Sequence, residues 1–216
     1  ALLLQVFYSV RSERQLMEQM RYNLLFRWFV GLAIDDDVWD HSVFSKNRDR
    51  LLAHAVVESF FAEVMALADK KGLLSKEHFS VDGTLIQAWA GQKSFRPKDG
   101  SDDQTPSGGG RNALADWKGR PRSNDTHAST TDPDSRLYRK SHNTASILCY
   151  QGHVLMENRT GLVVGAVVSH ADGTGERAAA LAMLDTVPGS RPKTVAADKA
   201  YDTADFVAAC RKRNMT

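Results

Sequence analysis

The sequence predicts an α/β fold in which a mixed β-sheet with flanking helices follows an all-α N-terminal domain. Apolar residues recur at helical spacing as far as Lys71. Beyond it, β-branched and aromatic residues form runs of strand character at His78–Gly91 and at Ala145–His170. Helix, strand and helix patterns then follow to Asn214. A strand, a hairpin and a crossover helix in this order are typical of a mixed layer with a right-handed connection.

Composition places the chain among ordinary soluble globular proteins. It has 216 residues, of which 42% are hydrophobic and 25% charged, enough for one large domain or two small ones. The net charge of +2 is small, so a nucleic-acid surface has to come from local clusters of cations. The two cysteines have no neighbouring thiol, which argues against a disulfide framework and favours a reducing, cytoplasmic location. The sequence shows no signal peptide and no apolar run of membrane-spanning length, so we expect no membrane partner.

Residues 1–75 are expected to form a helical domain. Ser12 followed by Gln15 is a capping-box pattern, and it predicts a helix that runs on to Gly31. The second half of this helix is apolar on all sides, so we expect it at the centre of a helical bundle. The side chains expected to be buried there are Leu24, Leu25, Trp28, Phe29 and Leu32.

Two more helices are predicted in this domain. The run Asp35–Asp37 lacks the ligand spacing of a calcium loop and indicates a turn. Asp40 or Ser42 then opens a short helix whose cations face water or phosphate, namely Lys46, Arg48 and Arg50. A long helix follows over His54–Lys71, and its predicted inner face consists of Val57, Phe60, Phe61, Val64, Met65 and Ala68.

A lone carboxylate, Asp82, stands in the apolar run His78–Gly91, which predicts a buried strand. A buried carboxylate is costly without a partner, so such a group is usually paired, exposed or bound to a cation. The run Thr194–Asp202 repeats the arrangement, with Asp198 after three small apolar residues. If the two strands are neighbours in one sheet, both carboxylates can face one point and bind a divalent metal. The alternative for each is a strand-end Asp that caps a turn.

Residues 92–143 interrupt this pattern and predict a flexible insertion or long loop. The triple glycine within Ser107–Arg111 is not followed by the Lys-Ser/Thr pair of a phosphate-binding P-loop. Cations interleave with Trp117 and Tyr138, a mixture that suits a phosphate backbone. Aspartates offset most of this charge, so a solvated loop remains an open alternative.

The remaining elements are predicted from periodicity and capping. Ala145–Glu157 and Gly161–His170 alternate with period two on either side of a turn, as hairpin strands do. Thr174–Val187 is rich in alanine and leucine and predicts a helix. Asp202–Asn214 predicts a last helix, with acidic residues at its start and cations at its end as the helix dipole prefers.

Taken together, these motifs resemble the DDE transposases of bacterial insertion sequences, in particular the insertion-sequence-five group. The resemblance lies in VDGTLIQAWAG around Asp82, in YRKSHNTASILCYQGHVLMENRTGLVVGAVVSHADG, and in VAADKAYDTADFV around Asp198. The segment YNLLFRWFVGLAIDDDVWDHSVFSKNRDRL also looks like the helical domain of this group, so the resemblance covers essentially the whole chain. Trp39 and Ala200 depart from it, because the family often has Pro and Gly there.

The resemblance implies a ribonuclease-H-like catalytic core in residues 76–216. Asp82 on the first strand and Asp198 on the fourth would share Mg²⁺ or Mn²⁺ ions, in a two-metal site, with a later Glu. Such ions activate the attacking oxygen and stabilise charge on the phosphate and the leaving oxygen. Water would free a 3′-hydroxyl at the end of the element, and this hydroxyl would attack target DNA. The resemblance also implies double-stranded DNA as the partner, a homo-oligomer on DNA, and a bacterial, nucleoid-associated location.

Four further residues are candidates for the site. Glu176 opens the helix after the hairpin, where ribonuclease H itself carries a metal-binding Glu, so it is either an auxiliary ligand or a plain helix N-terminal carboxylate. Arg139, Lys140 and His142 are candidates for phosphate contacts, the alternative being a solvated segment that leads into a strand. We expect DNA binding through residues 93–142, and through the predicted helix with Arg48 and Arg50, to weaken as salt rises.

The ends of the chain bear on its expected activity. It starts at Ala1 within a helix-like run and stops at Thr216, before the third acidic residue that the resemblance implies. We therefore expect a chain truncated at both ends, which binds Mg²⁺ or Mn²⁺ weakly and does not cleave DNA alone. Three function classes remain open: a DNA transposase, a hydrolytic nuclease of the same fold, and a catalytically inactive DNA-binding remnant. The helical domain and the basic block favour the transposase over the nuclease.

Overall fold

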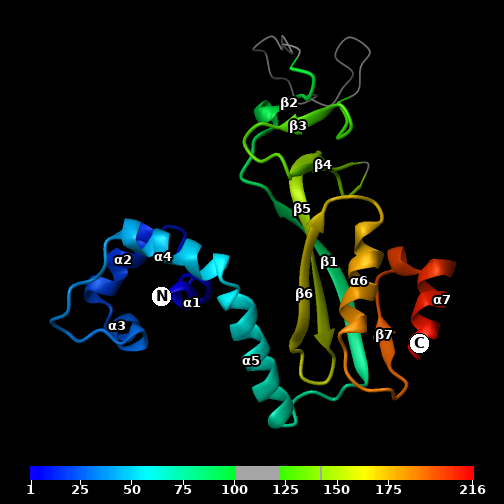
Figure 1. The fold of residues 1–216 in the computed structure, drawn as a ribbon, viewed down its shortest axis with the longest axis horizontal. Helices are drawn as coiled ribbons and strands as arrows, with labels where there is room; N and C mark the ends of the chain where they lie inside the picture. The colour runs from blue at the N-terminus through cyan, green and yellow to red at the C-terminus, as the bar shows by residue number, and fades with distance from the viewer. Residues whose placement is uncertain (101–121, 142) are drawn as a thin grey trace. The chain divides into compact units, whose positions relative to one another are not determined.

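The computed structural model describes residues 1–100, 122–141 and 143–216. These divide into two compact units, residues 1–71 and residues 72–216. The first unit is built from α-helices, and the second contains the β-sheets (Figure 1). The Ser107–Arg111 run and Trp117 lie outside the described residues.

The five helices of the first unit are α1 (Leu2–Phe7), α2 (Glu13–Tyr22), α3 (Leu24–Val30), α4 (His41–Ala53) and α5 (Val56–Lys70). Two of them, α2 and α4, begin at caps that the sequence predicts. The Ser12 hydroxyl accepts a hydrogen bond from the Gln15 N–H at 3.1 Å, so the predicted cap of α2 is confirmed. Asp40 caps α4 in the same way, through the Ser42 N–H at 2.8 Å.

The single helix predicted from Ser12 to Gly31 is wrong, because Asn23 divides it into α2 and α3. Asn23 has extended backbone angles, and its side-chain oxygen accepts from the N–H groups of Leu25 and Phe26. An Asn that bonds to nearby backbone N–H groups competes with helical hydrogen bonds and starts a new helix instead.

The predicted burial in this unit is also wrong. Trp28 is 75% exposed, and Leu24, Leu25 and Phe29 are exposed with it. On α5 the predicted inner face is open as well: Val57, Phe60, Phe61 and Val64 are exposed, and only Ala68 is buried. Helical periodicity identifies an apolar face but does not say what covers it. The buried cluster of the unit instead consists of Leu4, Val10, Leu16, Met17, Met20 and Phe26.

Arg48, predicted to face water or phosphate, is engaged by carboxylates within the first unit. Its guanidinium pairs with Glu13 of α2 and with the neighbouring Asp49. It therefore links α4 to α2. Across the described residues, no single helix is long and apolar enough to cross a membrane; α4 and α5 pass that test only as a pair bent by 66°.

Among the described residues, the main sheet of the second unit contains five strands. Four of them follow the predicted chain order, which is a strand, two hairpin strands and, after a helix, another strand. The strands are β1 (His78–Gln87), β4 (Arg136–Tyr138), β5 (Ile147–Glu157), β6 (Val163–His170) and β7 (Thr194–Ala196). β5 is antiparallel to β1, β4 and β6, and β7 is parallel to β1. The predicted hairpin is β5 and β6, so this part of the topology is confirmed.

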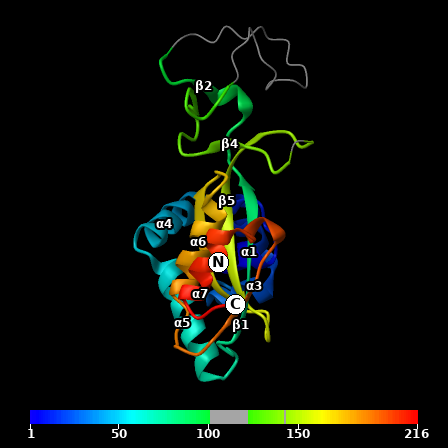
Figure 2. The same ribbon diagram turned by 90° about the vertical axis from the view of Figure 1, so that its right-hand side faces the viewer.

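Two helices, α6 (Gly175–Asp185) and α7 (Ala204–Lys212), cover one face of this sheet (Figures 1 and 2). The predicted last helix starts two residues later than expected, because the Thr203 hydroxyl accepts from the Phe206 N–H and caps it. The buried core between sheet and helices contains Phe79, Val81, Leu155, Ala180, Met183, Leu184, Tyr201, Phe206 and Cys210. The predicted fold class, a mixed sheet with flanking helices that follows an all-α region, is confirmed.

Part of the predicted insertion has regular structure. A short 3₁₀ turn, η1 (Gln92–Ser94), leads into β2 (Phe95–Pro97), which pairs with β3 (His127–Ser129). Phe95 is buried and stacks on the His127 ring at 5.4 Å between centroids. This pairing joins segments about thirty residues apart, and local periodicity does not report such long-range contacts.

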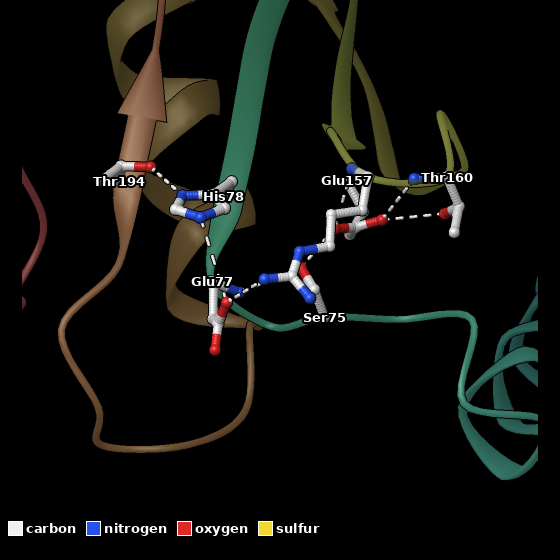
Figure 3. Close-up of polar contacts among 7 residues, drawn as sticks. Ser75, Glu77, His78, Glu157, Thr160 and Thr194 are labelled. Atoms are coloured by element: carbon white, nitrogen blue, oxygen red, sulfur yellow. Dashed lines mark hydrogen bonds and ion pairs between the residues drawn. The ribbon is translucent and has the colours of Figure 1, made fainter.

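A buried carboxylate fixes the turn between β5 and β6 (Figure 3). Glu157 is fully buried, and it accepts hydrogen bonds from the hydroxyls of Ser75 and Thr160 and from the N–H groups of Arg159 and Thr160. Burial alone would raise the pKa of Glu157, but these donors outweigh it and lower the pKa to about 2. The carboxylate is therefore ionised, and it ties the segment before β1 to the hairpin turn.

Candidate active site

The two aspartates of the predicted site stand at matching positions of two parallel neighbours. β1 and β7 pair as His78 with Thr194 and Ser80 with Ala196. Asp82 lies two residues after Ser80, and Asp198 lies two residues after Ala196. The register of the pair therefore brings both carboxylates to the same level, just beyond the point where β7 ends.

Each carboxylate is oriented through one of its oxygens. Asp82 Oδ1 accepts from the Gly83 N–H at 2.8 Å. Asp198 Oδ1 accepts from the Ala200 N–H at 3.1 Å, and this bond caps the short 3₁₀ turn η2 (Lys199–Tyr201). The turn-capping alternative considered for Asp198 is thus part of its geometry. For both residues, the structure records no hydrogen bond between Oδ2 and any other described residue.

Asp82 and Asp198 line one pocket of about 260 Å³ at this edge of the sheet. The pocket also receives Glu176 from the first turn of α6 and Lys140, which follows β4. Its remaining lining residues are Gly83, Thr84, Leu85, Tyr138, Ala200 and Tyr201.

Glu176 approaches β1 at Gly83. A Cβ atom added to Gly83 would lie 3.1 Å from Glu176 Oε1, so the missing side chain makes room for this carboxylate. Gln151 of β5, which is fully buried, donates from Nε2 to the same Oε1 at 3.2 Å. Glu176 therefore lies against the residue that follows Asp82 on β1, and both carboxylates line the same pocket.

The carboxylates set the electrostatics of the pocket wall. Burial, and then the negative charges of Glu176, Asp82 and Asp198, raise the pKa of Tyr201 to about 12. Burial and the charge of Glu176 also raise the pKa of Tyr138. Both phenols stay protonated at neutral pH. Sequence reasoning missed both tyrosines as lining residues; Tyr201 was signalled only by its place three residues after Asp198.

The loop that carries Asp198 is held by α6. The Arg177 side chain donates to the Ala200 carbonyl oxygen at 3.3 Å, which joins the first turn of α6 to η2. Sequence reasoning did not single out Arg177. Its position directly after Glu176, in the turn of the helix that faces the pocket, is the signal that could have identified it.

Of the three residues predicted to contact phosphate, one lines the pocket. Lys140 is exposed and lines the pocket, and Arg139 beside it is exposed but does not line it. His142 lies outside the described residues. In the described parts of the chain, no group of three or more His, Cys, Asp and Glu side chains could hold a metal ion.

Two family models match the chain. Residues 1–50 match the family described as Transposase domain (DUF772). Residues 74–216 match the family described as Transposase DDE domain, and that match spans most of the chain. The chain belongs to the DDE transposase family. No curated protein and no solved structure shows significant similarity to it.

Family membership establishes the general activity of this transposase. It is a DNA transposase of the insertion-sequence type, and phosphoryl transfer on DNA is the activity of its family. DNA is the partner on which such proteins act, and DDE transposases generally use divalent metal ions. The second match begins close to the boundary between the two compact units of the fold.

Proposed function

We propose that this transposase cleaves and joins DNA strands at the Asp82–Asp198 pocket by a DDE mechanism with Mg²⁺ or Mn²⁺ in a two-metal site. The observation that carries the proposal is the β1–β7 register, which brings the two carboxylates to one level. We also assign the chain to the insertion-sequence-five group, on the motifs around Asp82 and Asp198.

The residues of the pocket suit hard divalent cations. Mg²⁺ and Mn²⁺ prefer carboxylate oxygens and retain waters, so a site with few protein ligands and room for water and phosphate fits them. In Asp82 and Asp198, only Oδ1 accepts a hydrogen bond from another described residue, so Oδ2 of each is available to a cation. The pocket of about 260 Å³ has room for the ions, water and a phosphate. When bound, the ions would activate the attacking oxygen and stabilise charge on the phosphate and the leaving oxygen.

The chain's own residues would position the DNA. Lys140 is the cation of the pocket wall, and its ammonium would pair with a phosphate next to the scissile bond. Arg139 would contact the neighbouring backbone phosphate. The phenols of Tyr138 and Tyr201 are protonated at neutral pH, and their raised pKa values keep them so in alkaline solution as well; they can donate a hydrogen bond but cannot act as a base.

A metal titration tests the ligand assignment without relying on activity. We expect Asp82→Asn and Asp198→Asn each to weaken Mn²⁺ binding, measured by electron paramagnetic resonance, by a factor of about 10 or more, since each removes an anionic oxygen ligand. Asp205→Asn is the matched control, because Asp205 is an exposed carboxylate of α7 that lies outside the pocket. Unchanged Mn²⁺ binding in both pocket variants would show that these carboxylates are not the ligands.

A non-catalytic DNA-binding protein is the second candidate function. It is favoured by one observation: the described residues offer no cluster of three metal-binding side chains. Incubation with DNA that carries the ends of the element, in the presence of Mn²⁺, separates the two. Cleavage that disappears in Asp82→Asn supports the transposase mechanism, whereas DNA binding that changes neither with Mn²⁺ nor in Asp82→Asn supports the second candidate.

The chain is also proposed to act as a homo-oligomer on DNA. Large apolar side chains such as Trp28 and Phe60 are exposed in the first unit, and surfaces of this kind commonly mediate association. Sedimentation velocity of the free protein and of its DNA complex measures the stoichiometry. A single copy on DNA at every concentration would contradict the proposal.

A further inference from the structure

Trp89 is the most exposed of the large apolar side chains in the described structure. It lies two residues after the end of β1 and is 97% exposed. Neither a ring contact nor a hydrogen bond to its indole is recorded among the described residues. The pattern that placed Trp89 in a buried strand is therefore wrong at this residue, and neither the core nor the pocket explains the side chain.

The backbone on either side of Trp89 is fixed. The Ala88 N–H donates to the Leu148 carbonyl oxygen at 2.9 Å, and the Gln92 side chain donates to the Ser146 carbonyl oxygen at 2.7 Å. Ser94 closes the turn with two hydrogen bonds to the Gly91 carbonyl oxygen. The indole therefore projects from an anchored turn. The backbone loses little conformational entropy when the indole stacks on another planar ring.

The segment around Trp89 also carries cations that are available to a polyanion. Lys93 and Arg96 follow it closely and are exposed. The described structure gives neither of them an ion pair or hydrogen bond through its side chain. An exposed aromatic ring beside free cations is the combination that binds single-stranded nucleic acid, because bases stack on the ring while phosphates pair with the charges.

We propose that Trp89 stacks on an unpaired nucleobase of the DNA strand that enters the Asp82–Asp198 pocket. This inference rests on the proposed function of that pocket. Seven residues of extended chain separate Asp82 from Trp89, which allows at most about 24 Å between them. At about 3.4 Å per base along one strand, the stacked base lies within about seven nucleotides of the scissile phosphate.

Binding assays without metal isolate the stacking contact. We expect Trp89→Ala to weaken binding of a single-stranded oligonucleotide by a factor between about 5 and 150, because base–aromatic stacking has this magnitude. Binding of a fully paired duplex should change by less than about 2-fold, since paired bases are not free to stack on the ring. Val168→Ala is the control, because Val168 is also an exposed apolar side chain of the second unit but has no aromatic ring and lies outside the pocket; it should change neither affinity.

Indole fluorescence gives a second, direct readout. Single-stranded DNA should quench the emission of the wild-type chain, and Trp89→Phe should abolish most of that quenching. The proposal is overturned if Trp89→Ala retains wild-type affinity for the single strand, if it loses equal affinity for the duplex, or if Trp89→Phe is quenched like the wild type. Asp82→Asn should keep the quenching, so a failure of the proposed catalysis is distinguishable from a failure of the stacking contact.

Discussion

Gly83 shows how a single missing side chain shapes the pocket. Any larger residue there would press on the Glu176 carboxylate, which Gln151 also holds from β5. Glycine within a strand normally costs stability, because it lacks a side chain to pack and loses more conformational freedom on folding. At this position it serves the arrangement of charges around the site.

The effect of Gly83→Ala on stability should depend on whether Glu176 is present. In a Glu176→Ala background we expect Gly83→Ala to stabilise the protein by about 0.5–1 kcal/mol, the usual gain from replacing a strand glycine. In the wild-type background the contact with Glu176 should cancel or reverse that gain. Urea unfolding of the four proteins measures the coupling between the two sites.

Gly165→Ala serves as the control for this cycle. A Cβ atom at Gly165 would meet Leu155 and Met183 at ordinary contact distances and would not meet Glu176. Its effect should therefore be equal in the two backgrounds. Equal effects of Gly83→Ala in the two backgrounds would contradict the proposed contact.

Glu157 should make the stability of the second unit depend on pH. Its folded pKa of about 2 lies below the ordinary value of 4.5. A carboxylate with a depressed folded pKa stabilises the protein fully above its unfolded pKa, and this stabilisation is lost as the pH falls from about 4.5 toward 2. We expect Glu157→Gln to destabilise the protein by about 1–3 kcal/mol at pH 7, because hydrogen bonds to a charged acceptor are lost.

The measurement is urea unfolding at a series of pH values between 7 and 3. The difference between wild type and Glu157→Gln should shrink as the pH falls below about 4.5, since the unfolded wild-type chain then binds a proton at Glu157 that the folded protein binds only near pH 2. Asn124→Ala removes two hydrogen bonds to the Leu137 backbone but no ionisable group, so its difference from the wild type should not converge in this way. A constant difference across the range would mean that the Glu157 charge is not the stabilising feature.

At the scale of elements, Asn23 determines where one helix ends and the next begins. We expect Asn23→Ala to destabilise the first unit by about 1 kcal/mol, because two N–H groups of α3 lose their acceptor. Asn23→Ser retains a capping oxygen and should restore most of this stability. Thermal unfolding followed by circular dichroism compares them, and equal midpoints for the Ala and Ser variants would argue against a capping role.

The elements that the sequence predicted well are those whose signal is local. The β5–β6 hairpin, α6 and α7 follow from period-two and helical patterns with turn residues between them. The prediction failed where a side-chain cap interrupted a sustained pattern, as at Asn23, and where burial depended on what lies against an apolar face, as on α5. The β2–β3 pair was missed because its strands lie far apart in sequence.

The pocket residues also fall into those that the sequence identified and those that depend on tertiary structure. Asp82, Asp198 and Lys140 were selected from the sequence, and the structure places all three in one pocket. Their common location depends on the register of β1 with β7, which no local pattern specifies. Tyr138 was noted only as an aromatic residue among cations, since its approach to the carboxylates arises from tertiary folding.

For the molecule as a whole, the small net charge means that DNA affinity has to come from local cations. We expect affinity for duplex DNA to fall steeply with salt, because phosphate contacts release counterions. Neutralising two contacts, with the double variant Arg139→Gln and Lys140→Gln, should lower the slope of log affinity against log salt by about 2.

The charge-matched control for this experiment is Lys70→Gln with Lys71→Gln, at the end of α5. It removes the same net charge at a distance from the pocket in sequence, so its slope should stay close to that of the wild type. Fluorescence anisotropy at several salt concentrations provides the slopes. If both double variants lower the slope equally, general charge rather than a local contact governs binding.

The parallel pairing of β1 and β7 makes the chain unequally tolerant of changes in length. The segment between α6 and β7 ends at Lys193, whose backbone exchanges hydrogen bonds with Asn214 and Thr216 and thereby fixes where β7 begins. One residue added before Lys193 would lengthen a surface connection, whereas one added between Ala196 and Asp198 would turn the carboxylate to the other side of the strand. In related transposases, insertions should therefore occur before Lys193 and not between Lys193 and Asp198. The number of residues between these two positions should be constant, because it determines where the Asp198 carboxylate lies.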